Sequence, residues 1–290
     1  LRLHIDIPDT TDSLFVVDRD DHFKGVLMLS TILTNDPDRL VAEVMSTDVT
    51  GIPADMDDAK VAKLFENLNL VSAPVLDDDG KLIGRITIDD VVDVIRGDAD
   101  HSLLSLAGLD EEDDTFAPVI KSARRRAVWL GINLFTAFLA SWVIGLFQAT
   151  IEQVVALAVL MPIVASMGGI AGSQTLIIVI RGLALGQIGV SNARWLMYKE
   201  LAVSALNGIA WAMVVALISG LWFKNPDIGY IIGAALVINL LCAAVAGLAI
   251  PFVLTRLKID PAHAGTVILT TVTDVVGFLV FLGLGTAFLL

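Results

Sequence analysis

The sequence has one cysteine in 290 residues, Cys242. A disulfide framework and a cysteine-rich metal site are therefore excluded. Basic residues are also few, because 19 Lys and Arg stand against 32 Asp and Glu, and the formal net charge is −13. This charge repels a polyanion, so nucleic acid is not an expected partner. A glycine-rich P-loop for nucleotide phosphates is missing as well, which argues against an ATP-driven pump.

The negative charge is concentrated in the first part of the chain. Residues 1–123 hold 27 Asp and Glu and 10 Lys and Arg, whereas residues 124–290 hold 5 acidic and 9 basic residues. The second part is strongly apolar. The contrast predicts an α+β cytoplasmic region followed by an all-α polytopic membrane domain. The chain begins without methionine or a signal-peptide pattern, and we expect native N-terminal sequence to precede it.

The second part contains five segments that are long and apolar enough to cross a bilayer, which takes about 20 residues each. We expect the spans at about 127–147, 152–180, 196–223, 229–255 and 263–289. Lys and Arg are enriched before the first span and in the second and fourth connections, but not in the first and third. Because basic connections stay in the cytoplasm, we expect a cytoplasmic N-terminal region, an outside C-terminus and a plasma or inner membrane location.

The fifth span carries one acidic residue, Asp274, in a run that is otherwise apolar. A charge at this depth costs about 2.5–3.5 kcal/mol on insertion scales. Thr266, Thr270, Thr273 and Gly277 recur with it at steps of three and four residues, which predicts one shared helix face. With no obvious basic partner within the spans, a passing cation is one candidate partner. A protonated or hydrogen-bonded Asp274 that joins two helices is the alternative.

The second span combines Pro162 with a stripe of small residues. The candidates for lining an ion path are Ser166, Gly169, Gly172 and Ser173. A small-residue stripe leaves backbone carbonyls accessible to water, but it equally allows another helix to approach closely. Both interpretations of the stripe stay open from the sequence.

Residues 46–97 alternate helix-like and strand-like pieces and resemble a CBS domain, including its ending Gly84-x-x-Thr87-x-x-Asp90. In that family the matching Thr and Asp often contact the ribose of an adenine nucleotide such as ATP. The resemblance implies this role for Thr87 and Asp90, and capping of the next helix is the alternative. We expect a partial first CBS unit over 1–45, a second over 46–98, an acidic linker and connecting (plug) helix over 99–126, and the pore domain over 127–290.

The order of CBS units, acidic linker and five spans resembles the MgtE family of Mg²⁺ channels and transporters. The strongest local matches are "PIVASMGGIAGSQTLIIVIRGLA" and "IDPAHAGTVILTTVTDVVGFLVF". The resemblance implies a homodimer with the pore on the dimer axis, lined by the second and fifth spans. It implies that Asp274 binds hydrated Mg²⁺, that Thr270 contributes its backbone, and that Thr266 lines the pore.

The same resemblance implies that cytosolic Mg²⁺ bound to acidic CBS and linker surfaces closes the channel. The candidate regulatory residues are Asp55, Asp57, Asp58, Asp98, Asp100, Asp110, Glu111, Glu112, Asp113 and Asp114. The chain departs from the family at three asparagine positions, where it has Ile170, Ser173 and Thr266, so the ion preference stays open. The alternatives are an H⁺- or Na⁺-coupled transporter of Co²⁺ or Mn²⁺, and a CBS membrane sensor that transports nothing. Enzymatic activity is not expected.

Overall fold

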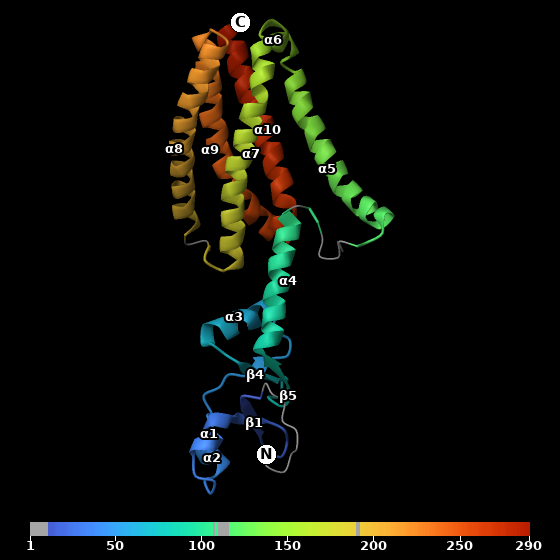
Figure 1. The fold of residues 1–290 in the computed structure, drawn as a ribbon, viewed down its shortest axis with the longest axis vertical. Coiled ribbons are helices and arrows are strands. Elements are labelled where there is room, and N and C mark those ends of the chain that lie inside the picture. The colour runs from blue at the N-terminus through green and yellow to red at the C-terminus, as the bar shows by residue number, and fades with distance from the viewer. Residues whose placement is uncertain (1–10, 107, 110–115, 190–191) are drawn as a thin grey trace. The chain divides into compact units, whose positions relative to one another are not determined.

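The structure is a computed structural model that describes residues 11–106, 108–109, 116–189 and 192–290, without the side chains of residues 98, 99, 102 and 103. The chain divides into two compact units, Leu1–His101 and Ser102–Leu290 (Figure 1). Each unit has its own secondary structure, α+β in the first and all-α in the second. The two units are described one after the other.

The first unit contains two β-hairpins, each followed by a helix. Its elements are β1 (Ser13–Val17), β2 (Phe23–Met28), α1 (Leu29–Thr34), α2 (Val41–Val44), β3 (Ile52–Pro53), α3 (Asp58–Leu68), β4 (Ser72–Leu76), β5 (Leu82–Thr87) and α4 (Ile88–Leu106), the last of which continues into the second unit. β1 and β2 pair antiparallel. β4 lies between β3, to which it is parallel, and β5, to which it is antiparallel.

The two hairpins have the same turn. Asp18 Oδ1 accepts hydrogen bonds from the backbone N–H groups two and four residues later, at 3.0 and 2.9 Å. Asp77 Oδ1 does the same in the second hairpin, at 3.0 and 2.8 Å. The turns also meet, because the Phe23 N–H donates to Gly80 O at 3.1 Å. This repeated construction is what two related half-units would have, although the expected unit boundaries stay a prediction.

The core of the first unit forms under α3. One face of this helix carries the buried side chains Val61 and Phe65, which pack with Ile52 of β3, Ala73 of β4 and Val91 of α4. The apolar residues of α3 recur at helical spacing, so a single stripe faces the sheet. The helix ends after Leu68, where the next residue adopts a left-handed backbone conformation with φ 51°.

The second unit is a bundle of six helices among the residues that the structure describes. These are α5 (Val119–Gly145), α6 (Gln148–Gln153), α7 (Val155–Ala184), α8 (Ala193–Trp222), α9 (Pro226–Arg256) and α10 (Pro261–Leu289). All except the short α6 are long and apolar enough to cross a membrane. The predicted order of an α+β region followed by an all-α region with five candidate spanning helices is confirmed.

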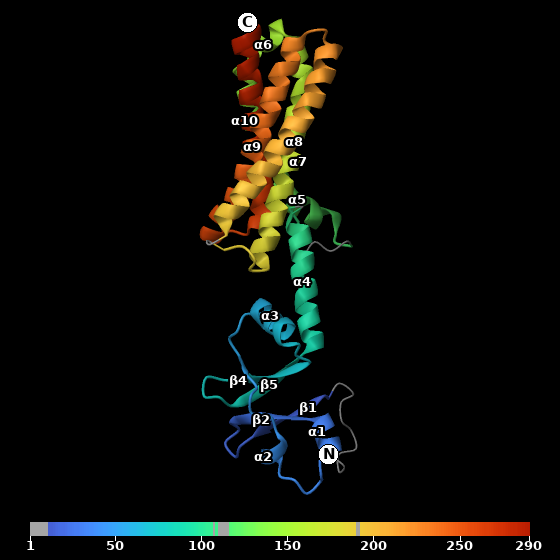
Figure 2. The same ribbon diagram turned by 90° about the vertical axis from the view of Figure 1, so that its left-hand side faces the viewer.

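α9 is the most enclosed of these helices. It packs against α7, α8 and α10 (Figure 1 and Figure 2). In its most apolar stretch 61% of the residues are buried, against 11% in α5, which packs mainly against α10. α9 and α10 also have well-defined starts. Asn225 and Asp260 each accept a hydrogen bond from the backbone N–H two residues later, at 3.0 and 2.9 Å, and proline is the first residue of each helix.

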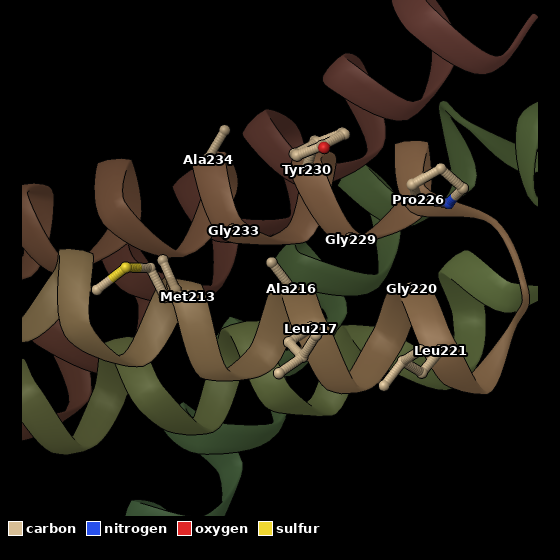
Figure 3. Close-up of a pocket in the computed structure, with 11 residues that line it drawn as sticks. Met213, Ala216, Leu217, Gly220, Leu221, Pro226, Gly229, Tyr230, Gly233 and Ala234 are labelled. Atoms are coloured by element: carbon tan, nitrogen blue, oxygen red, sulfur yellow. The ribbon is translucent and has the colours of Figure 1, made fainter.

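α8 and α9 approach each other through small residues. A Cβ on Gly229 would collide with the carbonyl oxygen of Ala216, so only glycine permits this crossing. Figure 3 shows Gly220, Gly229 and Gly233 along the crossing. An apolar groove of about 680 Å³ runs over these residues, with Tyr230 at its edge. Close contact between small residues is the usual basis of helix packing in a membrane.

Candidate functional site

Asp274 lies near the middle of α10. It follows the first residue of the helix by 13 positions, which is about 20 Å at a rise of 1.5 Å per residue. Its side chain is partly buried and makes no hydrogen bond or ion pair with any residue that the structure describes. Carboxylates in such surroundings are normally paired. The Asp274 carboxylate is instead accessible and unpaired within the described part of the chain.

The polar residues of α10 form two rows rather than one. Thr270 is exposed and Thr266 is partly exposed, in line with Asp274 at steps of four residues. Thr273 and Gly277 are buried inside the bundle. At 100° per residue the five positions lie within about 100° of one another around the helix axis, which agrees with one broad face, but burial divides that face into an accessible row and a buried row. The row next to Asp274 consists of the two threonines, and Thr270 Oγ1 donates to Thr266 O at 2.9 Å.

The small residues of α7 also separate into two groups. Ser166 is exposed, and Gly169 and Ser173 are partly exposed, so all three are accessible on the surface of the protomer. Gly172 is buried, and a Cβ added there would lie 2.9 Å from Leu269 Cδ1 of α10. The expectation that Gly172 lines an aqueous path does not agree with this packing. Its small size instead allows α7 and α10 to approach each other.

Asn239 of α9 joins the two helices that carry these candidate residues, and sequence reasoning missed it. It is fully buried, and its Nδ2 donates to Val164 O of α7 at 3.0 Å. Gly168 of α7 and Gly277 of α10 lie against the Asn239 amide, where a side chain on either would collide with it. The signal was a lone amide within the apolar run "ALVINLLC".

Glu200 of α8 was missed as well. It is 4% exposed inside a helix long enough to span a membrane. Its Oε2 accepts a hydrogen bond from Thr175 Oγ1 of α7 at 3.0 Å, and its Oε1 lies 3.0 Å from Lys199 Nζ. The signal was an acidic residue within a predicted span, where an ionisable side chain is uncommon.

The two candidate nucleotide residues of the first unit contact each other. The Thr87 N–H and Oγ1 both donate to Asp90 Oδ2, at 2.9 and 3.0 Å. Thr87 precedes α4 directly and Asp90 is its third residue, which is the arrangement of a capping box. The structure therefore contains the capping interaction that the sequence left as the alternative. Contact of these residues with a nucleotide stays a prediction.

The candidate regulatory acids divide into described and undescribed positions. Asp55, Asp57, Asp58 and Asp100 are exposed. The side chain of Asp98 and the whole run 110–114 lie outside the described residues. Asp18, Asp20 and His22 form the one group of three potential metal ligands found in the described part of the chain. Asp18 already has a cationic partner.

That partner is Lys24. Its ammonium lies 3.0 Å from Oδ2 of Asp18 and holds the pKa of this carboxyl well below its usual range. The Asp18 carboxylate also accepts the two backbone hydrogen bonds of its turn. These contacts occupy most of its acceptor capacity. The Asp18 turn is therefore stabilised by an ion pair and two hydrogen bonds, and we do not regard this group of residues as a candidate metal site.

Comparison with known proteins identifies both parts of the chain. Residues 161–284 match the model of the MgtE family, described as divalent cation transporters, and residues 41–97 match the CBS domain. Over its full length the chain is 32% identical to the magnesium transporter MgtE of Bacillus subtilis, and it spans 64% of that protein. Over 94% of its length it is 31% identical to the magnesium transporter MgtE of Thermus thermophilus, of which it spans 61%.

Among solved structures, the chain is similar to a crystal structure of the cytosolic domain of the Mg²⁺ channel MgtE in complex with ATP. The identity is 38% and the TM-score 0.29, over 30% of this chain and 35% of that one. The chain thus spans less than two thirds of the curated relatives that it matches. Residues 161–284 are therefore a domain of the MgtE type, described as divalent cation transporters, and residues 41–97 are a CBS domain that precedes it.

Proposed function

We propose that the chain forms a Mg²⁺ channel in which α7 and α10 line the pore and Asp274 binds the ion. The observation that carries this proposal is an unpaired carboxylate near the middle of a spanning helix, in line with Thr266 and Thr270. Mg²⁺ gives up its waters reluctantly and is usually held by one or two carboxylates. A carboxylate flanked by hydroxyl and carbonyl oxygens suits a largely hydrated ion. The curated relatives are named magnesium transporters, which supports Mg²⁺ as the substrate.

The proposed assembly is a homodimer with the pore between the two protomers. Ser166 of α7 and Thr270 of α10 are exposed on the surface of a single protomer. Polar side chains within a span normally face protein or water rather than lipid. A second copy placed over this surface would cover it and bring two Asp274 carboxylates to one path. Two carboxylates stabilise a divalent ion better than one does.

The proposed regulation uses the acidic first unit. Residues 1–123 carry 27 acidic and 10 basic side chains, so bound Mg²⁺ would relieve their mutual repulsion. In the proposal this compaction closes the pore through the linker, 99–126. The distribution of Lys and Arg in the connections supports a proposed cytoplasmic first unit and an outside C-terminus. In the proposal the Thr87 hydroxyl, which donates to Asp90 Oδ2, accepts a hydrogen bond from the ribose of ATP with its free lone pairs.

The experiment is metal flux into proteoliposomes, comparing Mg²⁺, Mn²⁺, Co²⁺ and Ca²⁺. Asp274→Asn keeps the shape of the side chain and removes its charge. We expect it to reduce Mg²⁺ flux by about tenfold or more, since each tenfold corresponds to about 1.4 kcal/mol of lost ion stabilisation. Glu152→Gln is the matched control, because Glu152 is exposed at the end of α6 and hydrogen-bonds only to Gln148 among the described residues.

Full Mg²⁺ flux through Asp274→Asn, at unchanged insertion, would remove Asp274 from the pore. Flux that disappears when the pH or Na⁺ gradient is collapsed would favour a coupled transporter instead. No flux of any ion through the parent protein, with intact metal binding, would favour a sensor. The three outcomes are distinguished in the same vesicles.

A further inference from the structure

The membrane unit contains a second polar site, between α7 and α8. Glu200 follows the first residue of α8 by seven positions, about 10 Å along the helix, and its side chain is 5% exposed. Beside it lies a cavity of about 140 Å³. A water takes about 30 Å³ in the liquid, so the cavity has room for about four waters or a partly hydrated cation. Its polar lining comprises Gln174, Thr175, Lys199, Glu200, Ser204 and Asn207.

The oxygen atoms of this cavity are only partly used by the protein. The Glu200 carboxylate has about four acceptor positions. Among the described residues it contacts the Thr175 hydroxyl and the Lys199 ammonium, each at 3.0 Å. Ser204 is 7% exposed, and its hydroxyl makes no hydrogen bond within the part of the chain that the structure describes. Ser204 lines the cavity, so its unpaired hydroxyl is available, beside the buried carboxylate, to a ligand bound there.

We propose that this cavity binds a small cation of the Mg²⁺ class, with Glu200 as its anionic ligand and Thr175 and Ser204 as neutral ones. Carboxylate and neutral oxygen atoms are the donors that hard cations prefer. Asp274 is not part of the cavity lining, so the site is separate from the proposed pore ion. The proposed cation site also does not depend on whether Asp274 lies on an ion-conduction path.

Lys199 occupies the Glu200 carboxylate when no cation is bound. Its side chain is 44% exposed, so the ammonium is able to move to water while its long apolar stem stays in place. Glu200 has no such freedom because it is buried. Lys199 is therefore a tethered competitor for the bound cation. A purely structural ion pair makes a different prediction, since removing one member of it would lower stability whether or not metal is present.

The test uses the full chain in detergent, with Asp274→Asn as the parent so that the proposed pore ion is removed. Melting temperatures are measured in chelator and in saturating Mg²⁺ for the parent, for Lys199→Met, and for Lys199→Met with Glu200→Gln. We expect Lys199→Met to melt below the parent in chelator but to gain more from Mg²⁺. A tenfold increase in affinity would add about 1.4 kcal/mol to the Mg²⁺ effect under saturation. Adding Glu200→Gln should abolish this excess.

The acidic first unit is identical in all variants. Its contribution therefore cancels when the Mg²⁺-induced changes in melting temperature are compared between variants. Lys224→Met is the control, because Lys224 is exposed beyond α8, and it should leave the Mg²⁺ effect unchanged. Equal Mg²⁺ effects in the parent and Lys199→Met would overturn the proposal, and so would an excess that survives Glu200→Gln. If Lys199→Met does not fold, Mn²⁺ bound to the parent and to Glu200→Gln is counted by electron paramagnetic resonance. One ion fewer in Glu200→Gln supports the site, and equal counts overturn it.

Discussion

The contact between Gly168 and Asn239 gives a stability prediction that the structure quantifies. In Gly168→Ala the new Cβ would lie 2.9 Å from Asn239 Cγ and closer still to Nδ2. Asn239 is fully buried, and turning its amide away would break the 3.0 Å hydrogen bond to Val164 O. Overpacking costs about 1–3 kcal/mol, and an unpaired buried N–H of the Asn239 amide costs about as much again. We therefore expect Gly168→Ala to lower the free energy of unfolding by about 2–6 kcal/mol.

The neighbouring residue supplies the matched control. A Cβ added to Gly169 meets no atom within 4 Å in the described protomer. Gly169→Ala should therefore be neutral or stabilising by up to about 1 kcal/mol, since alanine is the better helix former. The measurement is the melting temperature of each variant in the same detergent by fluorescence-detected size-exclusion chromatography. We expect Gly168→Ala to melt at least about 5 °C below Gly169→Ala.

Equal melting temperatures for the two variants would refute the reasoning. A double variant examines the cause more closely. Asn239→Ala removes the amide with which the new methyl group collides, although it leaves a cavity of its own. The combined loss in Gly168→Ala with Asn239→Ala should then be smaller than the sum of the single losses by about 1 kcal/mol or more. Strict additivity would show that the clash with Asn239 is not the source of the effect.

Two further predictions concern the first unit. Asp90→Ala removes the acceptor of both Thr87 hydrogen bonds and should cost about 1 kcal/mol in chemical unfolding of the CBS region, whereas the exposed Asp93→Ala should cost almost nothing. Equal losses would contradict the capping role. Lys24→Met should raise the pKa of Asp18 toward its usual value of 3.8. A carboxyl whose pKa is lowered in the folded state stabilises that state above pH 3.8, and the contribution is lost on acidification. The unmodified protein should therefore be more stable than Lys24→Met above about pH 4 and lose this advantage below it. Unfolding at each pH is followed by circular dichroism. An advantage independent of pH would refute this.

The five membrane helices were predictable because apolar length is a local property of the chain. The residues at which these helices begin were less predictable. α9 begins at Pro226 and α10 at Pro261, before the apolar runs from which the spans were predicted at 229 and 263. In both cases a capping side chain and a proline determine where the helix begins, and these lie outside the apolar run. A hydropathy average includes neither of them.

The partition of the polar residues was not predictable from one helix alone. Thr273 and Asp274 are adjacent in sequence, but one is buried and the other is accessible. Gly277 of α10 packs against the Asn239 amide, which belongs to a different helix, so the buried side of α10 depends on its neighbour. The same holds for Gly172, which is packed against Leu269 of α10 and Gly247 of α9. Periodicity gives the rows of a helix, and the neighbouring helices decide which row faces the core.

Glu200 and Asp274 are stabilised in different ways, and this difference supports separate roles for them. Glu200 is buried within one protomer, where Lys199 and Thr175 compensate its charge. Asp274 has no such partner among the described residues, and it lies in the row that is accessible at the protomer surface. A charge without an internal partner must be compensated from outside, by water, by an ion or by a second protomer. A conducted ion requires a site that it can reach and leave, which fits Asp274. A cation at Glu200 would instead have to displace Lys199 from a buried carboxylate, which lowers its apparent affinity and makes this site a poor conduction path.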